Sequence, residues 1–298
     1  MKQFNIKHIV ITGVGRSGTT ILGKIIHSFE GVEYVYEPYT IQALLPLLGI
    51  IEKDHWKNLY HSYLYEDIFM GAVAGRNLNL NEMDDSCIFK AKDETKILKR
   101  LCTTWRRDYL ENKINKNSAI AYKIAGMINF LPKLVNYYPD TKYVVIVRQW
   151  RDVFNSLLNK GWFNDYILKS KAGYLSWPNI VVDGKRVPFW VSKGLENYWL
   201  EKDEINKIAF YYMIMSYTLL KVIDNCIIVD YDELIENPNV VVKYLSTKLN
   251  CKFGGMTEKI ITTIERKTNN PYIGKGLNDY TICRLDNYYE EIIKKAKI

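Results

Sequence analysis

Residues 8–30 constrain the fold of this chain more than any other stretch. Residues 8–12 are a short β-branched apolar run typical of a buried parallel strand, and residues 19–29 carry apolar side chains at helical spacing. A glycine-rich turn, Gly-Val-Gly-Arg-Ser-Gly at 13–18, joins the two. In such a turn the backbone N–H groups and the helix dipole favour a bound anion. We therefore predict a phosphate-like ligand at the start of the first helix.

The turn also resembles a nucleotide-hydrolysing P-loop, but only in part. Gly13 and Gly18 have the P-loop spacing, whereas Thr19 stands where the P-loop lysine belongs. The cation lies three residues earlier, as Arg16. An ATP-dependent phosphotransferase therefore stays an alternative, and the missing lysine argues against it. The residues predicted to bind the anion are Gly15, Arg16, Ser17, Gly18, Thr19 and Thr20.

Composition narrows the fold and the partners. The 298 residues are 48% hydrophobic and 25% charged, which fits one α/β domain with a central, mostly parallel sheet flanked by helices. The net charge of +8 suits an anionic ligand, and the absence of an arginine-rich run or a known nucleic-acid motif argues against nucleic acid. The five cysteines and four histidines form no metal-binding pattern. No segment reads as a signal peptide or membrane span, so we expect a cytoplasmic protein without a membrane partner.

A second candidate site residue follows the alternating strand predicted at 32–36. Glu37 ends that strand beside the anion loop, where a carboxylate is well placed for chemistry. Pro38 follows it and should hold Glu37 in an extended backbone conformation. A solvated loop glutamate is the other interpretation of this residue.

A second anion site is predicted after the apolar strand at 142–147. Arg148 emerges from the carboxyl end of that strand, and Ser156 lies eight positions further on, in the following helix. A strand-end guanidinium and a helix hydroxyl can converge on one phosphate. Lys160 lies one helical turn beyond Ser156 and adds a further positive charge.

These motifs together resemble the sulfotransferases that use 3′-phosphoadenosine 5′-phosphosulfate (PAPS). The strand with Gly-Val-Gly-Arg-Ser-Gly-Thr-Thr is similar to their phosphosulfate loop, and Arg-x7-Ser is similar to the pair that binds the cofactor's 3′-phosphate. The resemblance implies a three-layer, P-loop-like sulfotransferase fold, with 3′,5′-diphosphoadenosine (PAP) as product and no metal. It implies that Arg16 stabilises the leaving phosphate. In the tyrosylprotein branch a glutamate placed like Glu37 is the base, whereas cytosolic members use a histidine, which leaves His55 and His61 as alternatives.

The resemblance extends more weakly towards the C-terminus. Tyr231 matches a family tyrosine near the cofactor, and Lys275 lies in a glycine–lysine loop like the basic loop that closes over it. We expect residues 1–298 to form a single domain in which 40–115 and 161–203 supply helices and loops on the acceptor side. Within the first of these, residues 93–112 are amphipathic and predict one helix.

The sequence thus predicts transfer of a sulfuryl group from PAPS to a hydroxyl or amine of a small-molecule or glycan acceptor. Glu37 is the predicted general base, and Arg16 the predicted catalytic cation. A nucleotide-binding protein without catalysis is the second alternative beside the kinase. The identity of the acceptor, the oligomeric state and the role of 161–203 stay open.

Overall fold

The computed structural model describes residues 6–103, 106–114, 118–169, 179–265 and 271–296. At its centre lies a five-stranded sheet whose neighbouring strands all pair in parallel, in the order β2-β3-β1-β4-β7. Because the strands are parallel, their carboxyl ends all lie at one edge of the sheet, the edge where open α/β sheets bind ligands. The strands are β1 (Lys7–Gly13), β2 (Val32–Tyr36), β3 (Ala119–Lys123), β4 (Lys142–Val147) and β7 (Cys226–Asp230).

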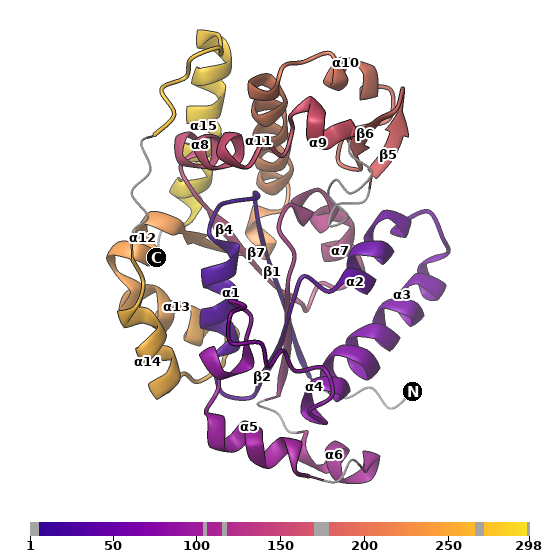
Figure 1. Cartoon of the computed structure of the whole chain (residues 1–298), viewed down its shortest axis with the longest axis vertical. Coiled ribbons are helices and arrows are strands. Elements are labelled where there is room, and N and C mark those ends of the chain that lie inside the picture. The colour runs from indigo at the N-terminus through magenta and orange to yellow at the C-terminus, as the bar shows by residue number, and fades with distance from the viewer. Residues whose placement is uncertain (1–5, 104–105, 115–117, 170–178, 266–270, 297–298) are drawn as a thin grey trace.

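Helices cover both faces of this sheet, as a parallel sheet with two apolar faces requires (Figure 1). Alternate residues of β1 show the division, because Ile9 and Ile11 belong to one core cluster and Val10 to the other. The predicted α/β fold with a flanked central sheet is confirmed. One face carries α1 (Thr19–His27), α12 (Tyr231–Glu236), α13 (Pro238–Leu249) and α14 (Gly255–Thr262), and the other carries α2 (Tyr39–Leu44), α3 (Lys53–Ser62), α7 (Leu131–Tyr137) and α11 (Glu204–Leu220).

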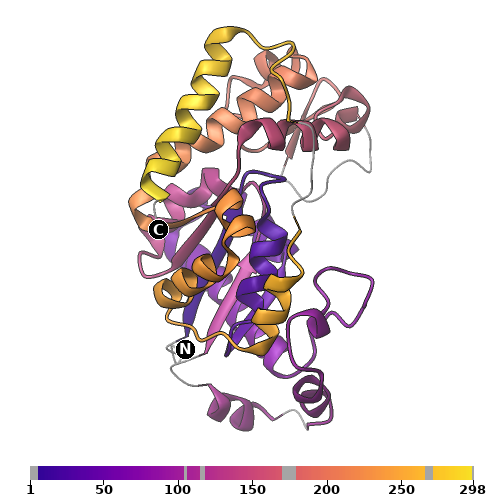
Figure 2. The same ribbon diagram turned by 90° about the vertical axis from the view of Figure 1, so that its left-hand side faces the viewer.

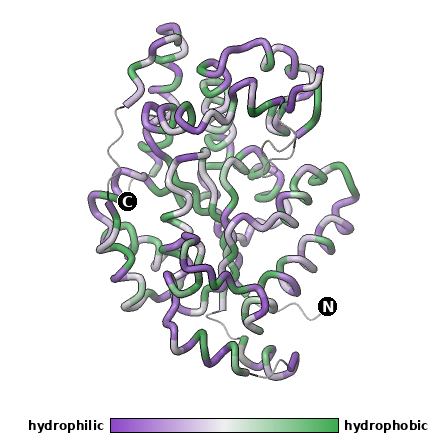
Figure 3. Tube along the Cα trace, viewed as in Figure 1, coloured by the Kyte–Doolittle hydropathy of each residue, from purple (hydrophilic) through white to green (hydrophobic). Residues whose placement is uncertain are grey.

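Two groups of helices mark the two ends of the strands. Helices α8 (Trp150–Lys160) and α15 (Asp279–Ala296) gather with α11 above the carboxyl ends, whereas α5 (Glu94–Leu101) and α6 (Arg107–Lys113) lie below the opposite edge (Figures 1 and 2). Hydrophobic stretches of the trace run through the central strands, and hydrophilic ones predominate in the outer loops (Figure 3). Among the described residues, every helix is too short or too polar to cross a bilayer.

The single helix predicted over 93–112 is wrong. The structure has two helices there, because α5 ends at Leu101, where the hydroxyl of Thr103 donates to the carbonyl of Lys99 and competes with the backbone ladder.

The aromatic segment 161–203 contains more regular structure than its pattern indicated, and its residues 170–178 lie outside the described part. It forms α9 (Asp165–Lys169), an antiparallel hairpin of β5 (Asn179–Val182) with β6 (Lys185–Pro188), and α10 (Glu196–Leu200). The remaining short elements are η1 (Leu45–Leu47), the π-helix η2 (Tyr63–Met70), α4 (Gly71–Val73), η3 (Ile88–Lys90), η4 (Met127–Phe130) and η5 (Ile223–Asn225).

Candidate active site

The loop from β1 to α1 is shaped as an anion cradle. Gly18 precedes α1 with φ 98°, no side chain caps the helix, and its first turn carries no acidic residue. The first N–H groups of α1 therefore have neither an intrahelical acceptor nor a carboxylate competing for them. Ser17 is fully buried, and its Oγ has no hydrogen-bond partner among the described residues. Arg16 is exposed and has φ 72°, a left-handed conformation that non-glycine residues rarely adopt.

The rear of this loop is held by a tyrosine of the aromatic helix α11. The N–H of Gly15 donates to the hydroxyl of Tyr211 on α11 at 2.8 Å, and burial raises the pKa of that hydroxyl. A Cβ on Gly15 would lie 2.7 Å from the ring of Trp162, so only glycine fits here. Because its N–H is already bonded, Gly15 shapes the loop. The N–H of Ser17 is likewise bonded, to the Val14 carbonyl, so the N–H groups at the start of α1 are the ones left to face an anion.

The predicted second anion site lies against the first. Arg148 follows β4 and is 8% exposed, with its guanidinium carbon 4.2 Å from the ring centroid of Tyr231. A Cβ on Gly18 would come within 2.5 Å of the same ring. The Tyr231 ring therefore lies against both the anion loop and Arg148.

The guanidinium of Arg148 has one nitrogen in an ion pair and another without a partner among the described residues. Its Nη2 donates to Asp152 Oδ2 at 3.2 Å, whereas its buried Nε has no partner among the described residues. The hydroxyl of Tyr212 donates to the Arg148 carbonyl at 2.9 Å and fixes the backbone. In addition, Arg16 Nε donates to Ser156 Oγ on α8 at 3.0 Å. The structure thus brings Arg16, Gly18, Arg148, Ser156 and Tyr231 together.

Glu37 lies at the carboxyl edge as predicted, but its backbone is not extended. Its φ is 44°, and this turn directs its N–H to the Lys123 carbonyl at 2.8 Å. Lys123 Nζ in turn donates to Glu37 Oε1 at 2.6 Å and lies 3.9 Å from the ring centroid of Tyr36. The double link to Lys123 explains why the left-handed conformation prevails over the preference imposed by Pro38.

Lys123 is the site residue that sequence reasoning missed. It is 1% exposed at the end of β3, and burial of an ammonium group is costly unless it is paired. A lysine closing an apolar strand of a parallel sheet was the available signal. With it, the carboxyl ends of all five strands carry a candidate group: the anion loop, Glu37, Lys123, Arg148 and Tyr231.

Neither alternative histidine lies near these groups. His61 and His8 both pack against the ring of Tyr65, near the start of β1, and burial lowers the pKa of His61. His55 is exposed in the first turn of α3 and pairs with Glu52. The structure therefore favours Glu37 over both histidines as the candidate base.

The two outlying lysines differ in position. Lys160 is exposed at the end of α8, one turn beyond Ser156. The loop of Lys275 instead packs on α8 through Tyr272, whose ring stacks on that of Phe154 at 5.6 Å. Phe154 and Ser156 are about 200° apart around the helix. The described contacts therefore place the Lys275 loop on the side of α8 away from Ser156 and do not bring it to the anion loop.

Two hollows lie near the Glu37–Lys123 pair. One, of about 370 Å³, runs along β2 from His27 to Glu37 and is walled by the loop Asn77–Ile88. The other, of about 20 Å³, lies between Gln42 on α2, the segment 124–130 and Phe189 with Trp190. Both segments expected on the acceptor side thus reach the carboxyl edge.

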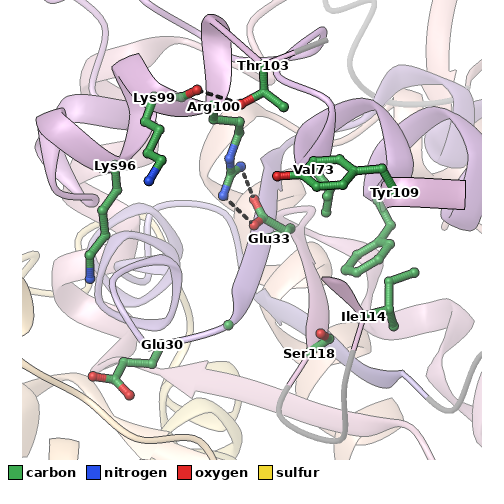
Figure 4. A pocket seen from close by; sticks show the side chains of 12 residues that line it. Glu30, Glu33, Val73, Lys96, Lys99, Arg100, Thr103, Tyr109, Ile114 and Ser118 are labelled. Carbon is green, nitrogen blue, oxygen red and sulfur yellow. Dashed lines mark hydrogen bonds and ion pairs between the residues drawn. The ribbon is translucent and has the colours of Figure 1, made fainter. Parts of the chain in front are cut away.

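A larger cavity, of about 500 Å³, lies at the opposite edge of the sheet (Figure 4). Its wall includes Lys96 and Lys99 of α5, and Arg100 of the same helix forms a two-pronged ion pair with Glu33, both bonds 2.9 Å. The pair lies near the start of β2, far from the strand ends that carry the candidate groups. Within the described ranges, no three histidine, cysteine, aspartate or glutamate side chains group as a metal site requires.

Comparison with known proteins identifies the family. The family model for the sulfotransferase family matches residues 8–171, more than half of the chain, so the chain belongs to the sulfotransferase family. No curated protein matches the chain.

Solved sulfotransferase structures resemble this chain at low identity. A sulfotransferase from Alicyclobacillus acidocaldarius is 12% identical with a TM-score of 0.43, covering 97% of this chain and 94% of its own. The sulfotransferase STF9 from Mycobacterium avium is 11% identical with a TM-score of 0.48, covering 99% and 78%. Mouse sulfotransferase SULT7A1, solved with PAP, is 12% identical with a TM-score of 0.38, covering 98% and 84%.

Proposed function

We propose that this sulfotransferase moves the sulfuryl group of PAPS to a hydroxyl or amine of a small-molecule or glycan acceptor. The observation that carries the proposal is the 3.0 Å contact between Arg16 and Ser156, which joins the anion loop to the second anion site. The residues fit a nucleotide with two separated phosphates, because each site offers an unpaired buried polar atom, Ser17 Oγ and Arg148 Nε. A buried polar atom without a partner is costly unless a ligand completes it.

The chain's own groups divide into two sets by position. The α1 N-terminus with Ser17, Thr19 and Thr20 holds the 5′-phosphate end, and Arg16 meets the negative charge that develops there as the sulfuryl group departs. Arg148, Ser156 and Lys160 hold the 3′-phosphate, and the ring of Tyr231 lies beside both Gly18 and the Arg148 guanidinium. Bound PAPS supplies the activated sulfuryl group. Arginine and amide donors provide the positive charge, so we propose that no metal takes part, and Lys275 remains a predicted cofactor contact.

Glu37 takes the proton from the acceptor. Lys123 holds Oε1 of this carboxylate at 2.6 Å and fixes its orientation, which leaves Oε2 to face the acceptor. Lys123 is therefore a positioning residue for the base. The hydrogen bond from the Glu37 N–H to the Lys123 carbonyl holds the left-handed backbone at Glu37, and this conformation also helps to orient the carboxylate.

The test is incubation with PAPS labelled in the sulfuryl group and fractionated metabolites, following the label. Arg148→Ala should weaken PAP binding at least tenfold, because a charged hydrogen bond to phosphate contributes about 1.5–3 kcal/mol. Glu37→Gln should lower turnover about 10²–10⁴-fold with PAP affinity unchanged. Equal PAP affinity in wild type and Arg148→Ala, or turnover of ATP with Mg²⁺ in place of PAPS, would overturn the proposal.

A further inference from the structure

The cavity at the opposite edge of the sheet has the size of a small-molecule site and lies apart from the proposed chemistry. Its volume of about 500 Å³ falls within the roughly 300–1,000 Å³ typical of such sites. Gly31 and Ser118 line it directly before β2 and β3, and each strand then runs for five residues before Glu37 or at Lys123 is reached. At about 3.3 Å per residue, roughly 17 Å separates the cavity from the candidate base. A ligand in the cavity is therefore not the acceptor of the reaction at Glu37.

Three cations of one helix line this cavity. Lys96, Lys99 and Arg100 lie at positions i, i+3 and i+4 of α5, which places them on one face of the helix. Arg100 is engaged by Glu33, whereas the ammonium groups of Lys96 and Lys99 form no ion pair with any described carboxylate, including Glu30 of the same wall. Figure 4 shows both ammonium groups on the same side of the Arg100–Glu33 pair. Two lysines thus face the cavity without a counter-charge.

The positive charges of this region affect one another. Like charges at these helical spacings repel and destabilise the helix. Lys92, one turn before Lys96, is buried and donates to the Phe29 carbonyl at 2.8 Å. Burial lowers the pKa of Lys92 to about 8, and the nearby Arg100 and Lys96 lower it further against the opposing effect of Glu33. An anion held in the cavity would relieve this repulsion.

The other side of the cavity is apolar. Figure 4 shows Val73, Tyr109 and Ile114 across the Arg100–Glu33 pair from the two lysines. Phe69, which is 2% exposed, belongs to the same wall. A bare phosphate or a polyanion would lose hydration against such a surface without gaining a polar partner. The wall instead suits a ligand that carries an apolar body beside its charge.

We propose that this cavity is a second binding site, for an organic anion with an apolar body and one carboxylate, sulfate or phosphate group. Lys96 and Lys99 bind the anionic group, and the wall formed with Tyr109 receives the body. Arg100 already donates to Glu33 and, at 3.0 Å, to the Ala72 carbonyl, so the two lysines make the contacts. The site is separate from the nucleotide and acceptor sites, and the inference does not depend on the proposed function.

The test measures binding of 8-anilinonaphthalene-1-sulfonate by fluorescence at saturating PAP. N-phenyl-1-naphthylamine, which has the same rings but no sulfonate, serves as the neutral probe. The double variant Lys96→Gln with Lys99→Gln is compared with Lys243→Gln with Lys248→Gln, which removes two exposed lysines of α13 and the same charge.

Wild type should bind the sulfonate at one site per chain. The Lys96/Lys99 variant should bind it about tenfold more weakly, at about three- to fivefold for each lost ion pair, whereas the α13 variant should stay within twofold of wild type. Affinity for the neutral probe should be the same in all three proteins. Tyr109→Ala should weaken the binding of both probes, because it removes part of the apolar wall.

Stability and salt dependence give independent readouts. Without probe, the Lys96/Lys99 variant should melt at the temperature of wild type or above it, because the repulsion on α5 is reduced. Added salt should weaken binding of the sulfonate and not of the neutral probe. Equal sulfonate affinity in wild type and the Lys96/Lys99 variant, an equal loss in the α13 variant, or a lower melting temperature of the Lys96/Lys99 variant would overturn the inference. Displacement of the sulfonate by PAP would place it in the nucleotide site and would overturn the inference as well.

Discussion

The two edges of the central sheet use polar residues in opposite ways. At the carboxyl edge, buried polar atoms such as Ser17 Oγ and Arg148 Nε are unpaired, and Arg16 and Glu37 have left-handed backbones. At the starting edge two charged groups are paired: Arg100 forms a two-pronged ion pair with Glu33, and Lys92 donates to the Phe29 carbonyl at 2.8 Å.

We interpret the unpaired groups at the carboxyl edge as candidates for ligand binding and the paired groups at the starting edge as contributors to the stability of the fold. Unpaired buried atoms and strained backbone cost free energy of folding and persist where a ligand or a reaction uses them. Closed ion pairs near the start of the strands have no such use, and breaking one leaves a buried charge behind. Substitutions at the carboxyl edge should therefore alter turnover and binding, and those of the paired groups at the starting edge should alter stability.

A large effect on turnover is expected for Arg16→Ala. This change removes the cation that we propose stabilises developing charge, so kcat should fall about 10²–10³-fold, as for loss of one preorganised donor. The melting temperature should stay within a degree or two, because Arg16 is exposed. Steady-state kinetics and a thermal melt check this, with Arg106→Ala, another exposed arginine, as control. A large loss of stability with normal kcat would break the comparison.

Arg100→Ala should lower stability and leave the binding of PAP unchanged. It leaves the carboxylate of Glu33, which is 7% exposed, without its partner and should lower the free energy of unfolding by about 3–5 kcal/mol. PAP affinity of the folded variant should not change. Chemical denaturation and calorimetric titration measure the two. The double variant Arg100→Ala with Glu33→Ala should regain part of the stability, and reduced PAP affinity would contradict the division between the edges.

His8 should make the stability of the starting edge sensitive to acid. Burial, with His61 nearby, lowers the pKa of His8 from 6.5 to about 4. Below pH 6.5 the unfolded chain takes up this proton before the folded chain does. The contribution of His8 to the free energy of unfolding is therefore complete above pH 6.5, and up to about 3 kcal/mol of it is lost as the pH falls towards 4. Unfolding of wild type and His8→Gln across this range checks it. Parallel pH dependence of the two proteins would rule out the assignment.

Tyr211→Phe should give the smallest effect, and it should alter both stability and PAP affinity. It removes the acceptor for the Gly15 N–H and should cost about 1 kcal/mol of stability. Because the same bond holds the anion loop, PAP affinity should also weaken, by less than tenfold. Stability and affinity measured on one preparation would show both changes. A change in stability alone would restrict Tyr211 to packing.

The sequence was sufficient for the sheet and for the groups at four of its strand ends. Periodicity marks buried strands, and the glycine turn and the Arg148–Ser156 spacing are local patterns. Lys123 could not be recognised in this way, because its role depends on β3 lying between β2 and β1, which no local pattern encodes. Tyr211 escaped notice for the same reason, since a buried tyrosine on an apolar helix looks like core until its hydroxyl is seen to meet Gly15.

Backbone conformation was the other quantity beyond reach. Pro38 indicates an extended Glu37, and only the contacts from Lys123 overturn that preference. The break between α5 and α6 likewise depends on a hydroxyl at Thr103 that competes for a carbonyl. In both places a long-range or side-chain bond outweighs an intrinsic tendency of the chain.

The position of the Tyr231 ring bears on which nucleotides can bind under the proposed function. Gly18 and the Arg148 guanidinium both lie against this ring, which therefore helps to fix the position of Arg148 relative to the anion loop. Under the proposed function, this fixed arrangement favours a nucleotide whose phosphates leave the ribose at two separate positions. A nucleotide whose phosphates form a single chain would occupy the anion loop and leave Arg148 without a phosphate.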